Sequence, residues 1–219
     1  MTGQQKHIPT GILISGRGSN MAALAKATFD STYPAKIALV VSDRPDASGL
    51  EWAKTHGLTT QVIDHKGYVS RESFEEALTT TLEDAGVEIL CNAGFMRLLT
   101  TSFVNRWHDR HLNIHPSLLP SFRGLHVHER VLKTGVCLTG CTVHYVRTEM
   151  DAGPIIAQAA VPVSPDDTSD SLAARVLKAE HKIYPLALKL VIEGRAPVID
   201  GRVQLHDVTL PPTFLTVPQ

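Results

Sequence analysis

The sequence predicts an α/β fold, with a Rossmann-like, mostly parallel sheet, helices on both of its faces and a mixed or antiparallel C-terminal part. Short apolar runs alternate with helical patterns over residues 8–115, which is the order of repeated βαβ units. Two extended runs, residues 137–146 and 154–163, then follow one another without a helix between them, which indicates antiparallel strands. Because 219 residues can bury a sizeable core, we expect one domain over residues 1–219.

The first half of the chain contains five predicted strands, and a helical pattern follows each of the first four. Apolar runs place the strands at residues 8–15, 36–42, 59–63, 87–91 and 112–115. Helices are expected over residues 21–27, 50–55 and 101–107, with one more between Ser70 as its cap and Gly86 after its end. This alternation predicts a parallel sheet covered by helices on both faces.

The second half of the chain has a different order of predicted helices and strands. A helix is expected over residues 126–133, and the two extended runs that follow are joined by residues 147–153. A long helix is predicted from about residue 168 to 193, and Pro185 inside it predicts a kink or a break. The Pro-rich tail, residues 196–219, offers one short strand candidate at 203–206.

Composition excludes several classes of protein. The 21 basic and 22 acidic residues argue against a nucleic-acid-binding surface over the whole molecule, although not against a local basic site. No apolar run approaches the roughly 20 residues that span a bilayer, and the N-terminus lacks the apolar region of a secretory signal. Three cysteines, an odd number, are typical of reduced thiols. We therefore expect a cytoplasmic protein without a membrane or nucleic-acid partner.

The turn after the first strand suits an anion. Gly18, Ser19 and Asn20 come between a strand and a helix, where backbone N–H groups and the helix dipole favour negative charge. The third glycine of a dinucleotide fingerprint would fall on Met21, and no Gly-Lys-Ser/Thr of a Walker loop follows. The pattern favours a small phosphorylated ligand over NAD, with an ordinary βα turn as the alternative.

The strand at residues 112–115 ends in two polar side chains. Asn113 and His115 alternate with apolar residues, so they share one face of the strand, and Pro116 cannot continue the ladder. A polar pair at the carboxyl end of a strand is typical of a catalytic site in an open α/β sheet. The alternative is a buried, hydrogen-bonded Asn and His beside an ordinary loop.

Other candidate groups are weaker. Asp151 lies in a loop between two strands, where spacing alone predicts a turn former. The eleven histidines include no HExxH motif, and the pair His126 and His128 lacks an evident third ligand, so we expect no metal. Ser117 is in no nucleophile elbow.

Five motifs in order, SGRGSN, AGFMRLL, NIHPSLLPSFRG, MDAGPII and AEHKIYP, resemble those of the folate-dependent glycinamide ribonucleotide formyltransferases. They run over residues 15–185. The resemblance implies transfer of the formyl group of 10-formyltetrahydrofolate to the amine of 5-phosphoribosyl-glycinamide, a step of de novo purine biosynthesis. It implies the fold predicted above, small-molecule substrates, no metal, and a monomer or homodimer. It also implies a nucleotide-binding part at about 8–115, a folate and catalytic part at about 116–195, and a tail over 196–219.

The resemblance also implies roles for individual residues. The implied catalytic residues are Asn113, His115 and Asp151. The implied substrate contacts are Gly18, Ser19 and Asn20 for the phosphate, and Glu180 near the glycinamide amine. The implied folate contacts are Arg71, Met96, Arg97, Leu98, Leu99 and Asn113. Two positions depart from the family pattern: Arg17 stands where Asn is common, and Ala152 where Gly is common.

The chemistry of formyl transfer fits these residue types. When a neutral amine attacks the formyl carbon, an oxyanion develops, which an Asn amide and an imidazolium can stabilise. The carboxylate of Asp151 would favour protonated His115 and help to relay the proton of the amine. Neither a covalent intermediate nor a metal is required.

Three other functions share some of these features. A formyltetrahydrofolate hydrolase would deliver the group to water, and a methionyl-tRNA formyltransferase to a charged tRNA; both usually carry a further domain. A dinucleotide-binding module would use Gly16, Gly18 and Asp43, but it lacks the third glycine.

Overall fold

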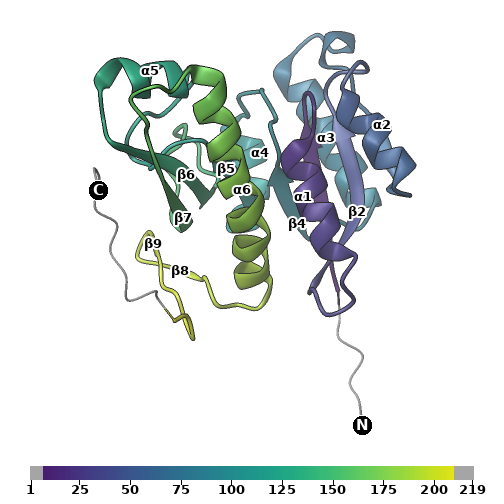
Figure 1. Ribbon diagram of the computed structural model, residues 1–219. Coiled ribbons are helices and arrows are strands. Elements are labelled where there is room, and N and C mark those ends of the chain that lie inside the picture. The colour runs from purple at the N-terminus through teal and green to yellow at the C-terminus, as the bar shows by residue number, and fades with distance from the viewer. Residues whose placement is uncertain (1–6, 210–219) are drawn as a thin grey trace.

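The computed structural model describes residues 7–209. Its centre is a seven-stranded sheet in the order β3-β2-β1-β4-β5-β6-β7 (Figure 1). The first five strands in sequence pair in parallel, and the last two are antiparallel. The strands are β1 Ile8–Ile14, β2 Ala35–Ser42, β3 Thr60–Val62, β4 Ile89–Asn92, β5 His111–His115, β6 Leu138–Tyr145 and β7 Ile155–Pro162. The predicted fold class is confirmed.

Helices fill the connections between the parallel strands, and two further helices precede β6 and follow β7. They are α1 Ser19–Thr28, α2 Ser48–Thr55, a short 3₁₀ helix His65–Gly67, α3 Arg71–Asp84, α4 Thr101–Arg106, α5 Val127–Thr134 and α6 Ser169–Ile192. Ser70 and Thr168 begin α3 and α6 with capping boxes, in which the cap hydroxyl accepts the backbone N–H three residues on. Gly57 and Gly86 follow α2 and α3 with positive φ, as the sequence predicts.

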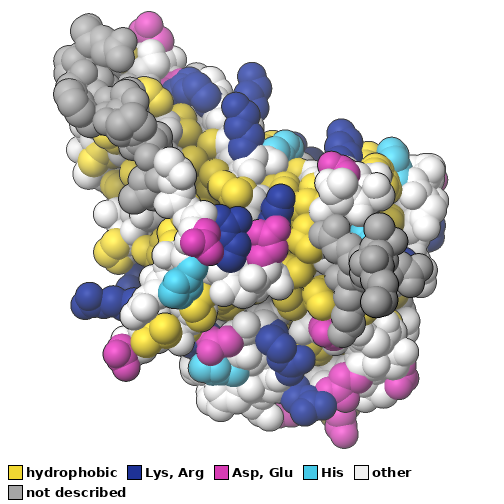
Figure 2. Space-filling model, turned by 90° about the horizontal axis from the view of Figure 1, so that it is seen from below, with side chains coloured by type: hydrophobic (Ala, Val, Ile, Leu, Met, Phe, Trp, Pro, Cys, Tyr) yellow, Lys and Arg dark blue, Asp and Glu magenta, His cyan; other side chains and the backbone are white. Residues whose placement is uncertain are grey.

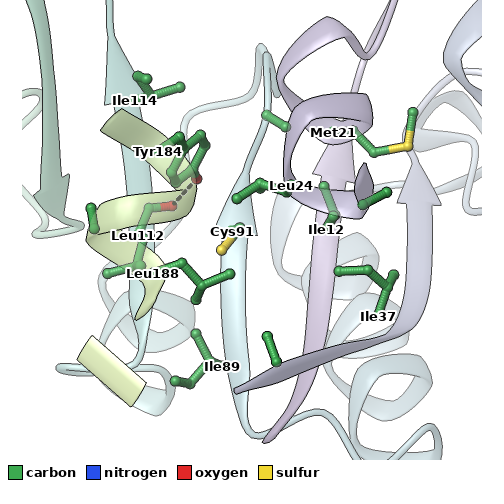
Figure 3. Close-up of a cluster of buried hydrophobic side chains, with 14 of the residues drawn as sticks. Ile12, Met21, Leu24, Ile37, Ile89, Cys91, Leu112, Ile114, Tyr184 and Leu188 are labelled. Carbon is green, nitrogen blue, oxygen red and sulfur yellow. Dashed lines mark hydrogen bonds between the residues drawn. The ribbon is translucent and has the colours of Figure 1, made fainter. Parts of the chain in front are cut away.

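Two apolar layers cover the faces of the sheet. On one face, α1 and α6 pack side by side on the central strands (Figures 1 and 3). On the other face, Phe74, Leu78 and Leu82 of α3 join Phe103 of α4 in a second cluster. These three α3 residues form the apolar stripe that is expected for a helix lying on a sheet.

Tyr184 ties α6 to β4 and to β5, the strand that carries the predicted polar pair. Its ring is fully buried, and its hydroxyl donates to the carbonyl of Asn92 at 2.8 Å. It also donates to the carbonyl of Leu112 at 3.3 Å (Figure 3). The helix therefore contacts the last residue of β4 and the strand β5 directly.

The sequence predicts a kink or a break at Pro185, and the break does not occur. The helix α6 is continuous from Ser169 to Ile192, although a proline lacks the N–H of one helical hydrogen bond. Buried residues lie on both sides of the proline, including Tyr184 and Leu188, so packing on the sheet holds both halves in one helix.

The C-terminal strand candidate is only partly correct. Two short strands, β8 Val198–Ile199 and β9 Arg202–Val203, form a separate hairpin, so residue 203 is in a strand but residues 204–206 are not. Residues 210–219 of the tail lie outside the described part of the chain. Among the helices of residues 7–209, none is long and apolar enough to cross a membrane.

Acidic and basic side chains are interspersed on the face shown in Figure 2, with no broad area of one sign. This distribution agrees with the formal net charge of −1.

Two glycines allow close backbone contacts in the antiparallel part. A Cβ on Gly140 would lie 1.9 Å from the carbonyl oxygen of Ala159 on β7, and one on Gly153 would lie 1.7 Å from that of Tyr145. The close approach of β7 to β6 and the position of the loop between them therefore depend on having glycine, which lacks a side chain, at these two positions.

His111, at the start of β5, is a buried neutral imidazole. It is 1% exposed, and burial lowers its pKa from 6.5 to about 3. An unfolded chain would bind a proton at this site below pH 6.5, whereas the folded chain would not until about pH 3. The native state is therefore disfavoured as the pH falls through this window.

We expect Gly140→Ala to lower the free energy of unfolding by about 1–3 kcal/mol, because the new Cβ must push β7 away from β6. Gly67→Ala is the matched control, since a Cβ there meets nothing within 4 Å and the backbone is not left-handed. Urea unfolding of both variants measures the difference. Equal stability of the two would contradict this account of the strand pairing.

We expect acid to destabilise the fold partly through His111. Above pH 6.5 the neutral ring does not lower the free energy of unfolding. As the pH falls from 6.5 toward about 3, the free energy of unfolding decreases through this group by at most about 1.4 kcal/mol per pH unit. Denaturant unfolding between pH 7 and 4 should give a shallower pH slope for His111→Leu than for the unmodified chain. Parallel slopes would show that His111 does not remain neutral.

Candidate functional site

A cavity with a volume of about 650 Å³ opens at the carboxyl ends of β4 and β5. Side chains from three neighbouring strands line it: Asn92 from β4, Asn113 and His115 from β5, and His144 from β6. Loops after β4, β5 and β6 complete the wall. This is the edge at which ligands bind in open α/β sheets.

His115 and Asp151 form a buried pair at this edge. His115 Nδ1 lies 3.3 Å from Asp151 Oδ2, and less than a tenth of either side chain is exposed. The other ring nitrogen, Nε2, donates to the carbonyl of Phe122 at 2.9 Å. Both nitrogens thus face acceptors, an arrangement that suits the imidazolium because it donates from both.

The loop that carries Asp151 is held in an uncommon conformation. Asp151 has φ 53°, in the left-handed region, where Asp is tolerated better than most residues. Its Oδ2 also accepts the backbone N–H of Gly124 at 2.9 Å. Ala152 does not have a positive φ, so alanine in place of the family's glycine costs the loop no backbone strain.

His144 is a site residue that sequence reasoning missed. It lies opposite Asn113 in the antiparallel pairing of β5 with β6, and its Nε2 is 3.1 Å from Asn113 Nδ2. Its Nδ1 donates to the carbonyl of Tyr145 at 2.9 Å, and burial lowers its pKa. Neutral His144 therefore accepts an amide proton of Asn113 through Nε2, which orients the amide. The signal that identifies His144 is its pairing opposite Asn113, and this strand register cannot be read from the sequence.

The loop after β4 forms an apolar rim. Met96, Arg97, Leu98 and Leu99 all line the cavity, and Met96 and Leu98 are largely exposed. The backbone N–H of Met96 donates to Ser15 Oγ at 2.9 Å, which ties this loop to the end of β1. The rim suits a ligand with a flat, largely apolar body.

A second cavity of about 390 Å³ lies beside the first and shares Gly94, Met96 and Arg97 with it. It is lined by the glycine turn, including Gly18, Ser19 and Asn20. Gly18 has φ 67°, in the left-handed region, and a Cβ there would lie 3.1 Å from the Cα of Gly49. The turn therefore favours glycine at the position before α1.

One N–H of the Asn20 side chain is already engaged. Its Nδ2 donates to Glu180 Oε2 of α6 at 2.6 Å, in a buried contact. Burial raises the pKa of Glu180, while the bond from Asn20 opposes that shift. The structure thus brings two of the predicted substrate residues together, and the glycine turn lines the second cavity along with Arg17, Arg44 and His65.

Two predicted site residues line neither cavity. Arg71 is exposed in the first turn of α3, and Glu180 is buried on α6 behind Asn20. Within residues 7–209, no group of three or more His, Cys, Asp or Glu side chains is arranged to hold a metal ion.

Comparison with known families gives a match to the formyl transferase family over residues 10–188. Among curated relatives, the trifunctional purine biosynthetic protein adenosine-3 of Gallus gallus is 49% identical over 89% of this chain. The chain spans only 19% of the length of that protein. The phosphoribosylglycinamide formyltransferase of Escherichia coli is 39% identical over 92% of this chain and 95% of its own length.

Solved structures agree with these matches. Glycinamide ribonucleotide transformylase 1 from Symbiobacterium toebii has a TM-score of 0.90 and 44% identity, over 92% of this chain and 95% of that one. A formyltetrahydrofolate deformylase from Pseudomonas syringae has a TM-score of 0.85 at 24% identity, which is a likeness of fold alone. The match over residues 10–188, together with nearly full-length similarity to the Escherichia coli protein, shows that this chain belongs to the formyl transferase family, among the phosphoribosylglycinamide formyltransferases.

Proposed function

We propose that this chain transfers the formyl group of 10-formyltetrahydrofolate to the amine of 5-phosphoribosyl-glycinamide. The observation that carries the proposal is the group of Asn113, His115 and Asp151 in a cavity that adjoins a glycine turn suited to phosphate. The names of the full-length relatives point to the same reaction.

In this proposal Asn113 is the direct donor to the oxyanion. Its Nδ2 carries two protons, of which His144 accepts one, and the other is left for the cavity. When the amine nitrogen attacks the formyl carbon, the carbonyl oxygen gains negative charge, and a positioned N–H stabilises it.

His115 acts on the same oxygen mainly through its charge. Both of its nitrogens are engaged, with the carbonyl of Phe122 and with Asp151, so direct donation would require one of these bonds to be exchanged. A buried imidazolium near the reacting carbonyl still stabilises negative charge, because less than a tenth of the His115 side chain is exposed to water.

The proton balance follows from the bonds that change. The amine loses a proton as the C–N bond forms, and N10 of the folate gains one as its bond to the formyl carbon breaks. Asp151 is the base in the cavity nearest to His115, and it can relay the proton through a water molecule. The products are the formylated glycinamide and tetrahydrofolate.

The nucleotide is assigned to the second cavity. Its phosphate would lie on the backbone N–H groups of residues 18–20 at the start of α1, where the helix dipole favours an anion. Glu180 would lie near the glycinamide amine, held by its bond to Asn20.

The folate is assigned to the first cavity, with the rim residues Met96, Arg97, Leu98 and Leu99 around it. This assignment divides the single predicted domain into a nucleotide part at about 8–115 and a folate and catalytic part at about 116–195. Because Arg71 lines neither cavity, we propose no contact between it and the bound folate.

The decisive experiment is a transfer assay with three acceptors. The purified chain is mixed with a 10-formyl-folate and with glycinamide ribonucleotide, water alone or methionyl-tRNA. The proposal predicts rapid release of the deformylated folate only with glycinamide ribonucleotide. Equal release in water would indicate the hydrolase instead.

We expect Asp151→Asn to reduce formyl transfer by roughly 10²-fold or more, because it removes the carboxylate partner of His115 and the proton relay. The transfer rate is measured against pH for both proteins. Nucleotide affinity should change little, since Asp151 lines only the first cavity. If the Asp151→Asn variant is as active as the unmodified chain, Asp151 is only a turn former.

We expect Ser19→Asp to raise the KM for the nucleotide by roughly tenfold or more, because a carboxylate next to the phosphate repels it. An acidic residue in the first turn favours α1 itself, so misfolding is not the expected cause of the loss. Ser19→Ala is the uncharged control. If the charged variant keeps the KM of the control, the phosphate binds elsewhere.

A further inference from the structure

A buried pair of side chains, Asn92 and His111, borders the first cavity, and the proposed reaction does not use it. His111 Nε2 lies 2.9 Å from Asn92 Oδ1, in a contact between the starting residue of β5 and the last residue of β4. Asn92 lines the cavity, whereas His111 lies behind it, with the ring of Phe103 at 6.0 Å. Such a polar pair is unusual in a layer of apolar side chains, so its orientation is informative.

The tautomer of His111 follows from its surroundings. The imidazole is neutral, since burial lowers its pKa to about 3, and it therefore carries one N–H. The carboxamide oxygen accepts that N–H at Nε2. Within residues 7–209, Nδ1 of His111 is buried and has no hydrogen-bond partner. The one hydrogen bond that the His111 ring makes within residues 7–209 therefore holds the oxygen of the Asn92 amide in place.

The other end of that amide is unused. With Oδ1 turned to His111, Nδ2 of Asn92 forms no hydrogen bond within the described part of the chain, although only 7% of the residue is exposed. Because Asn92 lines the cavity, two N–H donors are available to a ligand there.

The register places these donors relative to the reacting group. Asn92 is the direct Cα partner of Asn113 in the parallel pairing of β4 with β5. Neighbouring strands lie about 4.8 Å apart, and the two side chains share a face. If Asn113 contacts the formyl oxygen, Asn92 meets a part of the cosubstrate a few bonds away. In a 10-formyl-folate, the heterocycle is joined through one methylene to the nitrogen that carries the formyl group.

We propose that Asn92 is a specificity-determining residue, whose amide, held by His111, donates a hydrogen bond to an acceptor atom on the heterocycle of the folate. This inference rests on the proposed function, because it takes the first cavity as the folate site. A buried donor that is left unpaired disfavours a ligand without the matching acceptor. The pair therefore selects the heterocycle, whereas the catalytic residues act on the formyl group.

Asn92→Leu removes both donors with little change in side-chain size. We expect it to raise the dissociation constant of a non-reactive folate with the same heterocycle, tetrahydrofolate, by roughly tenfold. Titration calorimetry measures this constant, and the KM for the nucleotide should stay as it is. His111→Leu should weaken binding less, and His111→Gln, which keeps a side-chain N–H, should restore it.

The double variant Asn92→Leu/His111→Leu separates recognition from packing. It replaces the polar pair by apolar side chains, so a purely structural role predicts affinity like that of the unmodified chain. The proposal predicts binding as weak as for Asn92→Leu alone. Unchanged affinity of Asn92→Leu, or recovery in the double variant, would overturn it.

The transfer assay keeps this test distinct from the test of the proposed function. If the unmodified chain formylates glycinamide ribonucleotide and Asn92→Leu binds folate normally, then only the inference about Asn92 fails. If the unmodified chain transfers no formyl group, then the proposed function fails first.

Discussion

The site depends on one constraint, the pairing of β5 with a parallel strand on one side and an antiparallel strand on the other. The first register sets Asn113 beside Asn92, and the second sets it opposite His144. Three amide and imidazole side chains thus form a row across the carboxyl edge of the sheet. If either strand shifted by one residue, its side chain in this row would point to the opposite face of the sheet, into the apolar layer beneath α6.

Burial gives the histidines of this edge different properties. His111 and His144 are desolvated, so both are held neutral, and each offers an amide one fixed donor or acceptor. His115 instead faces a carboxylate and a carbonyl, an arrangement that accommodates positive charge. Histidine therefore has two roles at this edge. His111 and His144 each orient an amide, whereas His115 supplies charge to the proposed reaction, and the neighbours of each ring decide which role it has.

The loops of the site hold several residues in the left-handed region. Phe122, His126 and Asp151 have φ between 53° and 55°, and Phe122 also accepts the hydrogen bond of His115. Such backbone states are disfavoured for residues other than glycine, and they persist where the surroundings fix them. Here the bond from Gly124 to Asp151 joins the loops after β5 and β6, which keeps the carboxylate next to the imidazole.

The sequence by itself determined the order of the strands and helices, because apolar periodicity, caps and glycines act within a few residues of one another. It also placed Asn113 and His115 on one face of a strand, since alternation is local. Only the tertiary structure decided that α6 continues through Pro185, that Asn20 turns to Glu180, and that His144 and His111 orient the two amides. These features arise from contacts between residues 19 to 160 positions apart, which depend on strand register and packing rather than on local pattern.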